Sequence, residues 1–146
     1  AVAGATAELV GRRILTCSSR VIVENGGDIF LCTRSDTTVA LYAGESPFSM
    51  KIGIQVPGDG QPHGIATSSG TVGHSYSRGN ADAVTVICRS AALADAAATR
   101  IANAVHCGDD MRRLGEETAD YPFIEGIVAI RGKEIAAWGN VSLVSL

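Results

Sequence analysis

Hairpin turns between short apolar runs are the feature that most constrains the fold of this chain. Near the N-terminal end, the sequence Asn-Gly-Gly at 25–27 separates an apolar run at 21–23 from another at 28–32. Asn-Gly tolerates the positive φ angles that a two-residue turn needs, so this stretch predicts two antiparallel strands. Arg-Gly at 131–132 and Gly-Asn at 139–140 are similar turn signals near the C-terminal end. We therefore expect a sheet of mostly antiparallel strands.

The remaining periodic segments complete an α+β pattern. Apolar residues at helical spacing predict a helix over 1–15, a second one from Ala91, capped by Ser90, to about His106, and a shorter charged one over 109–120. Further strands are predicted at 37–42, 50–56, 83–88, 123–130, 133–138 and 141–146. Residues 57–80, rich in Gly, Pro, Ser and Thr, predict a long functional loop. We expect one α+β domain over 1–146, with a mostly antiparallel sheet and helices packed on one face.

Composition narrows the function classes. The net charge is −3 and the pI is near 5.5, which leaves no basic face for the phosphates of a nucleic acid. Ala and Gly supply 38 residues and aromatic residues only 7, so the core must use aliphatic side chains and close backbone approach. The sequence contains no leader pattern and no run of about 18 apolar residues, so we expect no membrane span and a cytoplasmic protein. Because the chain begins at Ala1 rather than Met, we treat it as a fragment of a longer protein.

The glycine turn near the N-terminal end is the first candidate site. Asn25, Gly26, Gly27 and Asp28 are explained either by the backbone angles of a hairpin or by ligand binding. In the second case the glycines let a ligand approach the backbone, and Asp28 accepts a hydrogen bond from it.

A hydroxyl-rich segment at 67–75 is the second candidate site. Thr67, Ser68 and Gly70 belong to a run whose successive backbone N–H groups can bind an anion such as phosphate. Ser69 and His74 are its candidate catalytic side chains, since an imidazole transfers protons near neutral pH. A plain Ser/Gly loop is the alternative.

Asp95 and Thr99 form the third candidate site. They lie about 40° apart around the helix that begins at Ala91, at the usual advance of about 100° per residue. Magnesium prefers a carboxylate, a hydroxyl and substrate phosphates, so this spacing allows a metal site. An ordinary polar stripe on an alanine-rich helix is the alternative.

Three motifs in order carry a resemblance to a known family. They are Glu-Asn-Gly-Gly-Asp-Ile at 24–29, Gly-Ile-Ala-Thr-Ser-Ser-Gly at 64–70, and Ala-Asp at 94–95 with Thr99. This set resembles the FAD:protein FMN transferase (ApbE) family. The sequences at 67–75 and 81–83 look closest to its ApbE-like branch. The resemblance implies a T-fold-related fold, and it implies that an N-terminal portion is missing here or lies on another chain.

The resemblance also implies roles for individual residues. Asn25, Gly26, Gly27 and Asp28 would help form a flavin pocket, and Asp95 with Thr99 would bind Mg²⁺ beside the pyrophosphate of FAD. A Ser or Thr hydroxyl of an acceptor protein would attack the FMN-side phosphate, and AMP would leave. The transferases follow the Ser/Gly segment with His-x-x-Asp-Pro-x-x-Gly, whereas His74 is followed here by Ser-Tyr-Ser-Arg-Gly-Asn. Part of the family's catalytic wall is therefore unmatched.

Two other functions fit the sequence. The first is a non-catalytic ligand-binding or assembly protein on the same fold. The second is a sulfur carrier that uses Cys32 or Cys88, which requires an exposed thiol of lowered pKa. Edge strands of an incomplete domain also lead us to expect a homo-oligomer.

Overall fold

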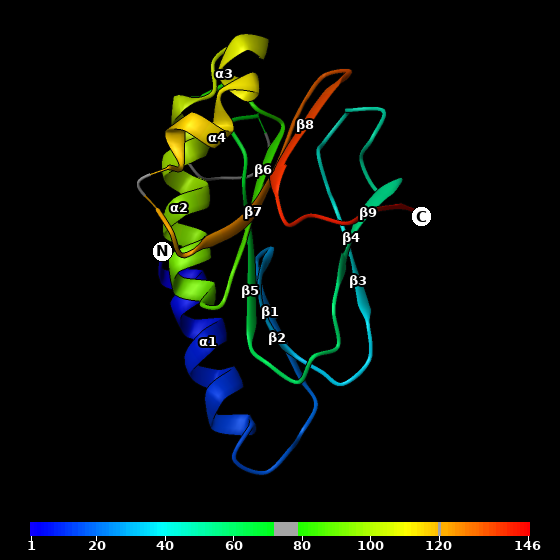
Figure 1. The fold of residues 1–146 in the computed structure, drawn as a ribbon, viewed down its shortest axis with the longest axis vertical. Helices are drawn as coiled ribbons and strands as arrows, with labels where there is room; N and C mark the ends of the chain where they lie inside the picture. Colours follow the sequence, from blue (N-terminus) through cyan, green and yellow to red (C-terminus); the bar gives the residue numbers. More distant parts are fainter. Residues whose placement is uncertain (72–78, 120) are drawn as a thin grey trace.

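Three layers make up the protein in a computed structural model that describes residues 1–71, 79–119 and 121–146 (Figure 1). A six-stranded antiparallel sheet stands in the middle, with helices on one face and a three-stranded sheet on the other. The fold is therefore α+β with helices on one face, as the sequence predicts. The small sheet covering the opposite face is a layer that local patterns did not reveal.

The large sheet has the strand order β1-β2-β5-β6-β7-β8. The predicted hairpin is confirmed, because Asn25 pairs with Asp28 across the turn between β1 and β2. The strands β2 and β5 pair so that Ile29 lies opposite Ile65. The bounds are β1 Val21–Asn25, β2 Asp28–Cys32, β5 His63–Ser68, β6 Ala83–Cys88, β7 Ile124–Arg131 and β8 Glu134–Gly139.

The small sheet has the order β3-β4-β9, with β3 Thr37–Ala40, β4 Ile52–Val56 and β9 Leu143–Ser145. Apolar side chains from both sheets, among them Leu31, Ile54 and Ile130, fill the layer between them. With three strands against six, the small sheet leaves part of the large one uncovered, and Ile22 on the edge strand β1 is 52% exposed.

Two long helices cover the other face of the large sheet. They are α1 (Val2–Ile14) and α2 (Ala91–Ala104), and Ser90 caps α2 by accepting a hydrogen bond from the Leu93 N–H, as predicted. Gly4 lets the two helices approach closely, since a Cβ there would lie 2.7 Å from the Cβ of Asp95. None of the helices described is long and apolar enough to cross a membrane.

Three local predictions are wrong. The supposed long loop over 57–80 contains β5, a central strand of the large sheet. The turn at 139–140 does not join a hairpin, because β9 pairs with β4 of the small sheet rather than with β8. The charged helix over 109–120 is two short ones, α3 (Gly108–Arg112) and α4 (Leu114–Glu117).

Candidate functional site

A cavity of about 990 Å³ gathers residues from all three candidate segments. It lies where β2 begins and β5 ends, beside one face of α2. Because β2 and β5 are antiparallel and Ile29 pairs with Ile65, the start of β2 and the end of β5 fall at the same end of the sheet. The predicted residues that line the cavity are Gly26, Gly27, Asp28, Thr67, Ser68, Ser69, Asp95 and Thr99.

Asp28 is buried at the start of β2, with 7% of its surface exposed. The backbone N–H of Thr67 on β5 donates a hydrogen bond to its carboxyl group. The side chain alternates with that of Ile29, so it points to the helix side of the sheet while Ile29 packs between the sheets. The hairpin therefore places this carboxyl group directly below α2.

Asp95 reaches the same place from α2. Its side chain accepts a hydrogen bond from the Gly4 N–H at 2.9 Å, so α1 and α2 hold the carboxylate between them. Thr99 follows one helical turn later and lines the same cavity. The predicted juxtaposition of a carboxylate and a hydroxyl is present, although Asp95 is buried rather than part of an exposed polar stripe.

The two carboxyl groups lie side by side and interact. Burial, the negative charge of Asp95 and a side-chain hydrogen bond with Asp95 together raise the pKa of Asp28 to about 7. Two neighbouring carboxylates in a partly enclosed cavity form an arrangement that a divalent cation neutralises.

Other donors would have to complete a metal site here. Within the described ranges no group of three or more His, Cys, Asp and Glu residues is arranged to hold a metal ion. Mg²⁺ is commonly bound by one or two carboxylates together with substrate phosphates and water. Asp28, Asp95 and the hydroxyl of Thr99 fit that donor set.

The glycine turn leaves the cavity open at its rim. Gly26 and Gly27 have φ angles of 64° and 95°, and a Cβ at either position would meet no atom within 4 Å. The hairpin explanation is confirmed by these angles, and the ligand-binding explanation stays a prediction for a turn that borders the cavity. Asn25 is not among the lining residues, and its amide donates to the carbonyl oxygen of Ala3 at 3.3 Å.

The hydroxyl-rich segment contributes only in part. Thr67, Ser68 and Ser69 line the cavity, and the Ser69 hydroxyl accepts a hydrogen bond from the Thr71 N–H at 3.1 Å. Gly70 is not a lining residue, and its N–H donates to the carbonyl oxygen of Ala81 at 2.8 Å. His74 lies outside the described residues.

The cysteines proposed as sulfur carriers are both buried. The Cys88 thiol donates to the carbonyl oxygen of Ser90 at 2.9 Å, and burial raises its pKa. Cys32 donates to the carbonyl oxygen of Gly60 at 3.4 Å, and neither cysteine lines the cavity. A raised pKa is the opposite of what a reactive thiol needs.

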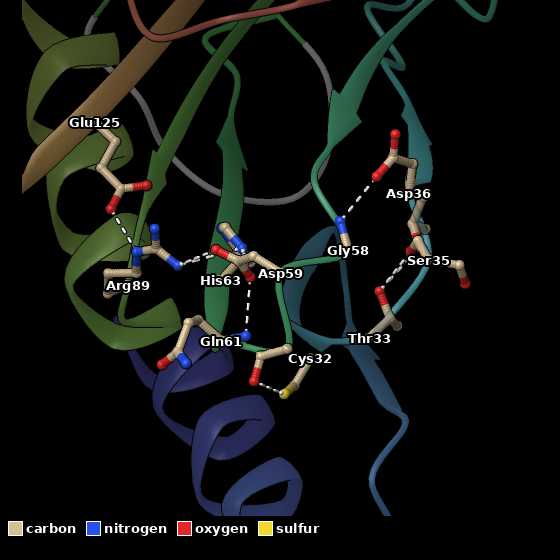
Figure 2. A network of polar contacts seen from close by, with 12 residues as sticks. Cys32, Thr33, Ser35, Asp36, Gly58, Asp59, Gln61, His63, Arg89 and Glu125 are labelled. Carbon is tan, nitrogen blue, oxygen red and sulfur yellow. Dashed lines mark hydrogen bonds and ion pairs between the residues drawn. The ribbon is translucent and has the colours of Figure 1, made fainter.

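At the other end of β5, charged side chains form a closed network (Figure 2). His63 is buried, and its Nε2 lies 3.0 Å from Asp59 Oδ1. Arg89 joins Asp59 at 3.1 Å to Glu125 at 2.7 Å. Positive and negative groups alternate here, so each carboxylate has a partner.

One wall of the cavity was not predicted as part of a site. Ile22, Val39, Tyr42 and Met50 line it from β1, from β3 and from the connection between β3 and β4. In the sequence these are ordinary apolar residues of strands or strand ends. Only the packing of the two sheets places them beside the polar groups.

Comparison with known proteins shows the family of this chain. Residues 1–120 match the protein family described as AbpE bacteria. A UPF0280 protein of Methanococcus aeolicus is 41% identical over 145 residues, which cover 96% of this chain and 58% of that protein. A UPF0280 protein of Methanopyrus kandleri is 44% identical over 147 residues, with 96% and 58% covered. This chain thus spans less than two thirds of the length of these relatives, and it belongs to the AbpE bacteria family, as its ApbE-like motifs predict.

Proposed function

We propose that this protein binds a phosphate-bearing small molecule together with Mg²⁺, with FAD as the leading ligand. The observation that carries the proposal is the carboxyl pair of Asp28 and Asp95, which faces a cavity of about 990 Å³ lined by hydroxyl groups. Without a cation the pair is destabilised, as the raised pKa of Asp28 indicates. A magnesium ion bound by Asp28, Asp95 and Thr99 would offset negative charge on a pyrophosphate.

The other lining groups have matching roles. The hydroxyls of Ser68 and Ser69 line the cavity and are the donors we assign to phosphate oxygens. The Thr67 hydroxyl instead lies 2.8 Å from the hydroxyl of Thr85. The open rim at Gly26 and Gly27 lets the ligand lie against the backbone, because no side chain stands there.

The reaction we propose is transfer of FMN from FAD to a Ser or Thr hydroxyl of an acceptor protein. The acceptor oxygen forms a bond to the FMN-side phosphorus while the P–O bond to the AMP-side phosphate breaks. The hydroxyl proton is released and AMP is the leaving group. Family membership and the cavity support this proposal, whereas the missing Asp-Pro sequence after His74 favours a protein that binds the ligand without transfer.

Calorimetric titration of FAD into the longest natural form of the protein, with and without Mg²⁺, tests the binding step. Asp95→Asn keeps the size of the side chain and an acceptor for the Gly4 N–H but removes the charge. Thr99→Val removes only the hydroxyl. We expect binding that depends on Mg²⁺ and weakens at least about tenfold in Asp95→Asn.

Asp109→Asn is the matched control, because this carboxylate is exposed on α3 and does not line the cavity. It should bind FAD like the wild type. Failure of the wild type to bind FAD under either condition would refute the proposal. AMP production from FAD is then assayed with Mg²⁺ and a cell extract as the source of acceptor. Binding of FAD without production of AMP would support the non-catalytic ligand-binding protein instead of the transferase.

A further inference from the structure

The cavity has an apolar wall that the phosphate and metal groups do not use. Three of the large hydrophobic residues that the structure leaves exposed lie on it: Ile22 is 52%, Met50 56% and Tyr42 59% exposed. Isolated exposed hydrophobic residues are common on protein surfaces, but here they border one concave site. This wall therefore offers apolar surface to a ligand rather than to the core.

The fold separates this wall from the polar groups. Ile22 pairs with Leu31 across β1 and β2, and Leu31 packs in the layer between the two sheets. Asp28 and Asp95 lie on the helix side of the same sheet. The cavity thus passes around the end of β2, with charged groups at one end and apolar groups at the other.

The connection over 41–51 carries two residues of the wall, and its backbone is unusual. Met50 has a φ angle of 57°, and it is the residue other than glycine with positive φ among those the structure describes. Its N–H donates to the carbonyl oxygen of Leu41 at 2.8 Å, which closes the connection and brings Tyr42 and Met50 together at the cavity. An L residue held in this conformation is strained, and such strain is concentrated at ligand-binding sites.

The volume of the cavity also exceeds what phosphates need. At about 990 Å³ it lies at the upper end of the range of about 300–1,000 Å³ found for sites that enclose whole organic ligands. A tyrosine ring and a methionine thioether are both favourable partners for an aromatic ring. The space beside them suits a flat, apolar group attached to the phosphates.

We propose that Tyr42 and Met50 hold the planar heteroaromatic ring of the ligand whose phosphates lie at the Asp28 and Asp95 end. The inference rests on the proposed function and adds which residues select the ring. Met50 keeps its strained backbone because the side chain is needed at this wall. Ring binding and phosphate binding then belong to different residues and can be measured separately.

Three ligands, each carrying only the ring or only the phosphates, test this in the longest natural form of the protein. Riboflavin and adenosine have rings without phosphates and distinguish an isoalloxazine from an adenine site. Magnesium pyrophosphate has no ring. We expect one of the two ring compounds to bind, about fivefold to tenfold more weakly in Tyr42→Ala and nearly unchanged in Tyr42→Phe. Pyrophosphate should bind the same in the wild type and in both variants.

Met50→Gly separates a ligand contact from a structural role. Glycine adopts positive φ freely, so the thermal midpoint should not fall while ring binding weakens. Leu9→Ala, at a position 71% exposed on α1 and outside the cavity, is the control and should bind the ring normally.

The proposal is wrong if neither nucleoside binds, or if Tyr42→Ala and Met50→Gly bind the ring as tightly as the wild type does. If the wild type binds the ring but not magnesium pyrophosphate, the proposed metal and phosphate site is wrong and the proposed ring site is supported.

Discussion

The carboxyl groups at the two ends of strand β5 have pKa values shifted in opposite directions. At the His63 end, burial works against ionisation of Asp59, but hydrogen bonds from the Gln61 N–H, His63 and Arg89 lower its pKa to about 2. At the Ser68 end, burial and the neighbouring Asp95 raise the pKa of Asp28 to about 7. At the His63 end the carboxylate is paired with positive groups and hydrogen-bond donors, whereas at the Ser68 end two carboxyl groups face each other. The difference supports placing the proposed binding site at the Ser68 end, since strongly shifted pKa values cluster at functional sites.

Glycine substitutions should give the largest contrast between the two ends. At Gly64, near the His63 end, a Cβ would lie 2.3 Å from the backbone nitrogen of Ala91, and neither backbone can move away. We expect Gly64→Ala to cost at least about 3 kcal/mol in the free energy of unfolding, measured by urea denaturation.

Gly26→Ala is the matched change at the open end. No atom lies within 4 Å of the added Cβ, so only the strain of a φ angle of 64° remains, about 1 kcal/mol. Equal losses in the two variants would mean that the close approach of β5 to α2 is not as the structure describes.

The dependence of stability on pH should differ between Asp28 and Asp59, and this is the next largest effect. Asp28 binds its proton more tightly in the folded state, with a pKa of about 7 against 3.8 for an unperturbed group. The free energy of unfolding of the metal-free protein should therefore fall as the pH rises from about 4 to about 7. Asp28→Asn mimics the protonated carboxyl group, so it should flatten this fall and stabilise the protein by about 2 kcal/mol at pH 8.

Asp59→Asn should lower the free energy of unfolding, whereas Asp28→Asn should raise it. The folded state of the wild type holds this carboxylate ionised, so its contribution to stability is present above about pH 4 and is lost as the pH falls towards 2. Urea denaturation across this range tests both residues. A fall in stability at pH 8 in Asp28→Asn would contradict the assignment of unpaired charge to the Ser68 end.

Breaking the network at the His63 end should have the smallest effect. Arg89→Ala removes the ion pairs with Asp59 and Glu125, whose side chains are partly exposed, so we expect a loss of about 1 kcal/mol. Arg112→Ala removes an ion pair with Asp109 in which both side chains are about three quarters exposed, and it should change stability very little. Thermal unfolding at low and high salt compares the two variants, and equal effects would show that the network adds nothing.

Much of the fold could be predicted from local sequence. Turn dipeptides and alternating apolar residues located the β1–β2 hairpin, β6 and the strands β7 and β8, and the Ser90 cap located the start of α2. Strand β5 was missed because Pro62 and Gly64 resemble loop residues. Gly64 is a glycine because β5 packs against the backbone of α2, and that contact joins segments far apart in the sequence. The partner of β9 is non-local for the same reason.

The polar half of the candidate site was predicted and the apolar half was not. Asp28, Thr67, Asp95 and Thr99 have side chains whose chemistry marks them in any sequence, and the structure places them around one cavity. Tyr42 is an ordinary apolar residue at a strand end, and the positive φ angle of Met50 leaves no trace in the sequence. Tyr42 and Met50 reach the cavity only because one sheet packs on the other.

The difference in width between the two sheets has a consequence for how this protein can change over evolution. The cavity exists where the small sheet stops short, so it is not hollowed out of the packed interior. Substitutions at the exposed positions of the connection over 41–51, Tyr42 and Met50, can alter its shape, whereas Leu41 and Ala43 belong to the core between the sheets and must be kept. Under the proposed function, relatives with the same scaffold can differ in ligand choice through these exposed positions while the rest of the architecture stays constant.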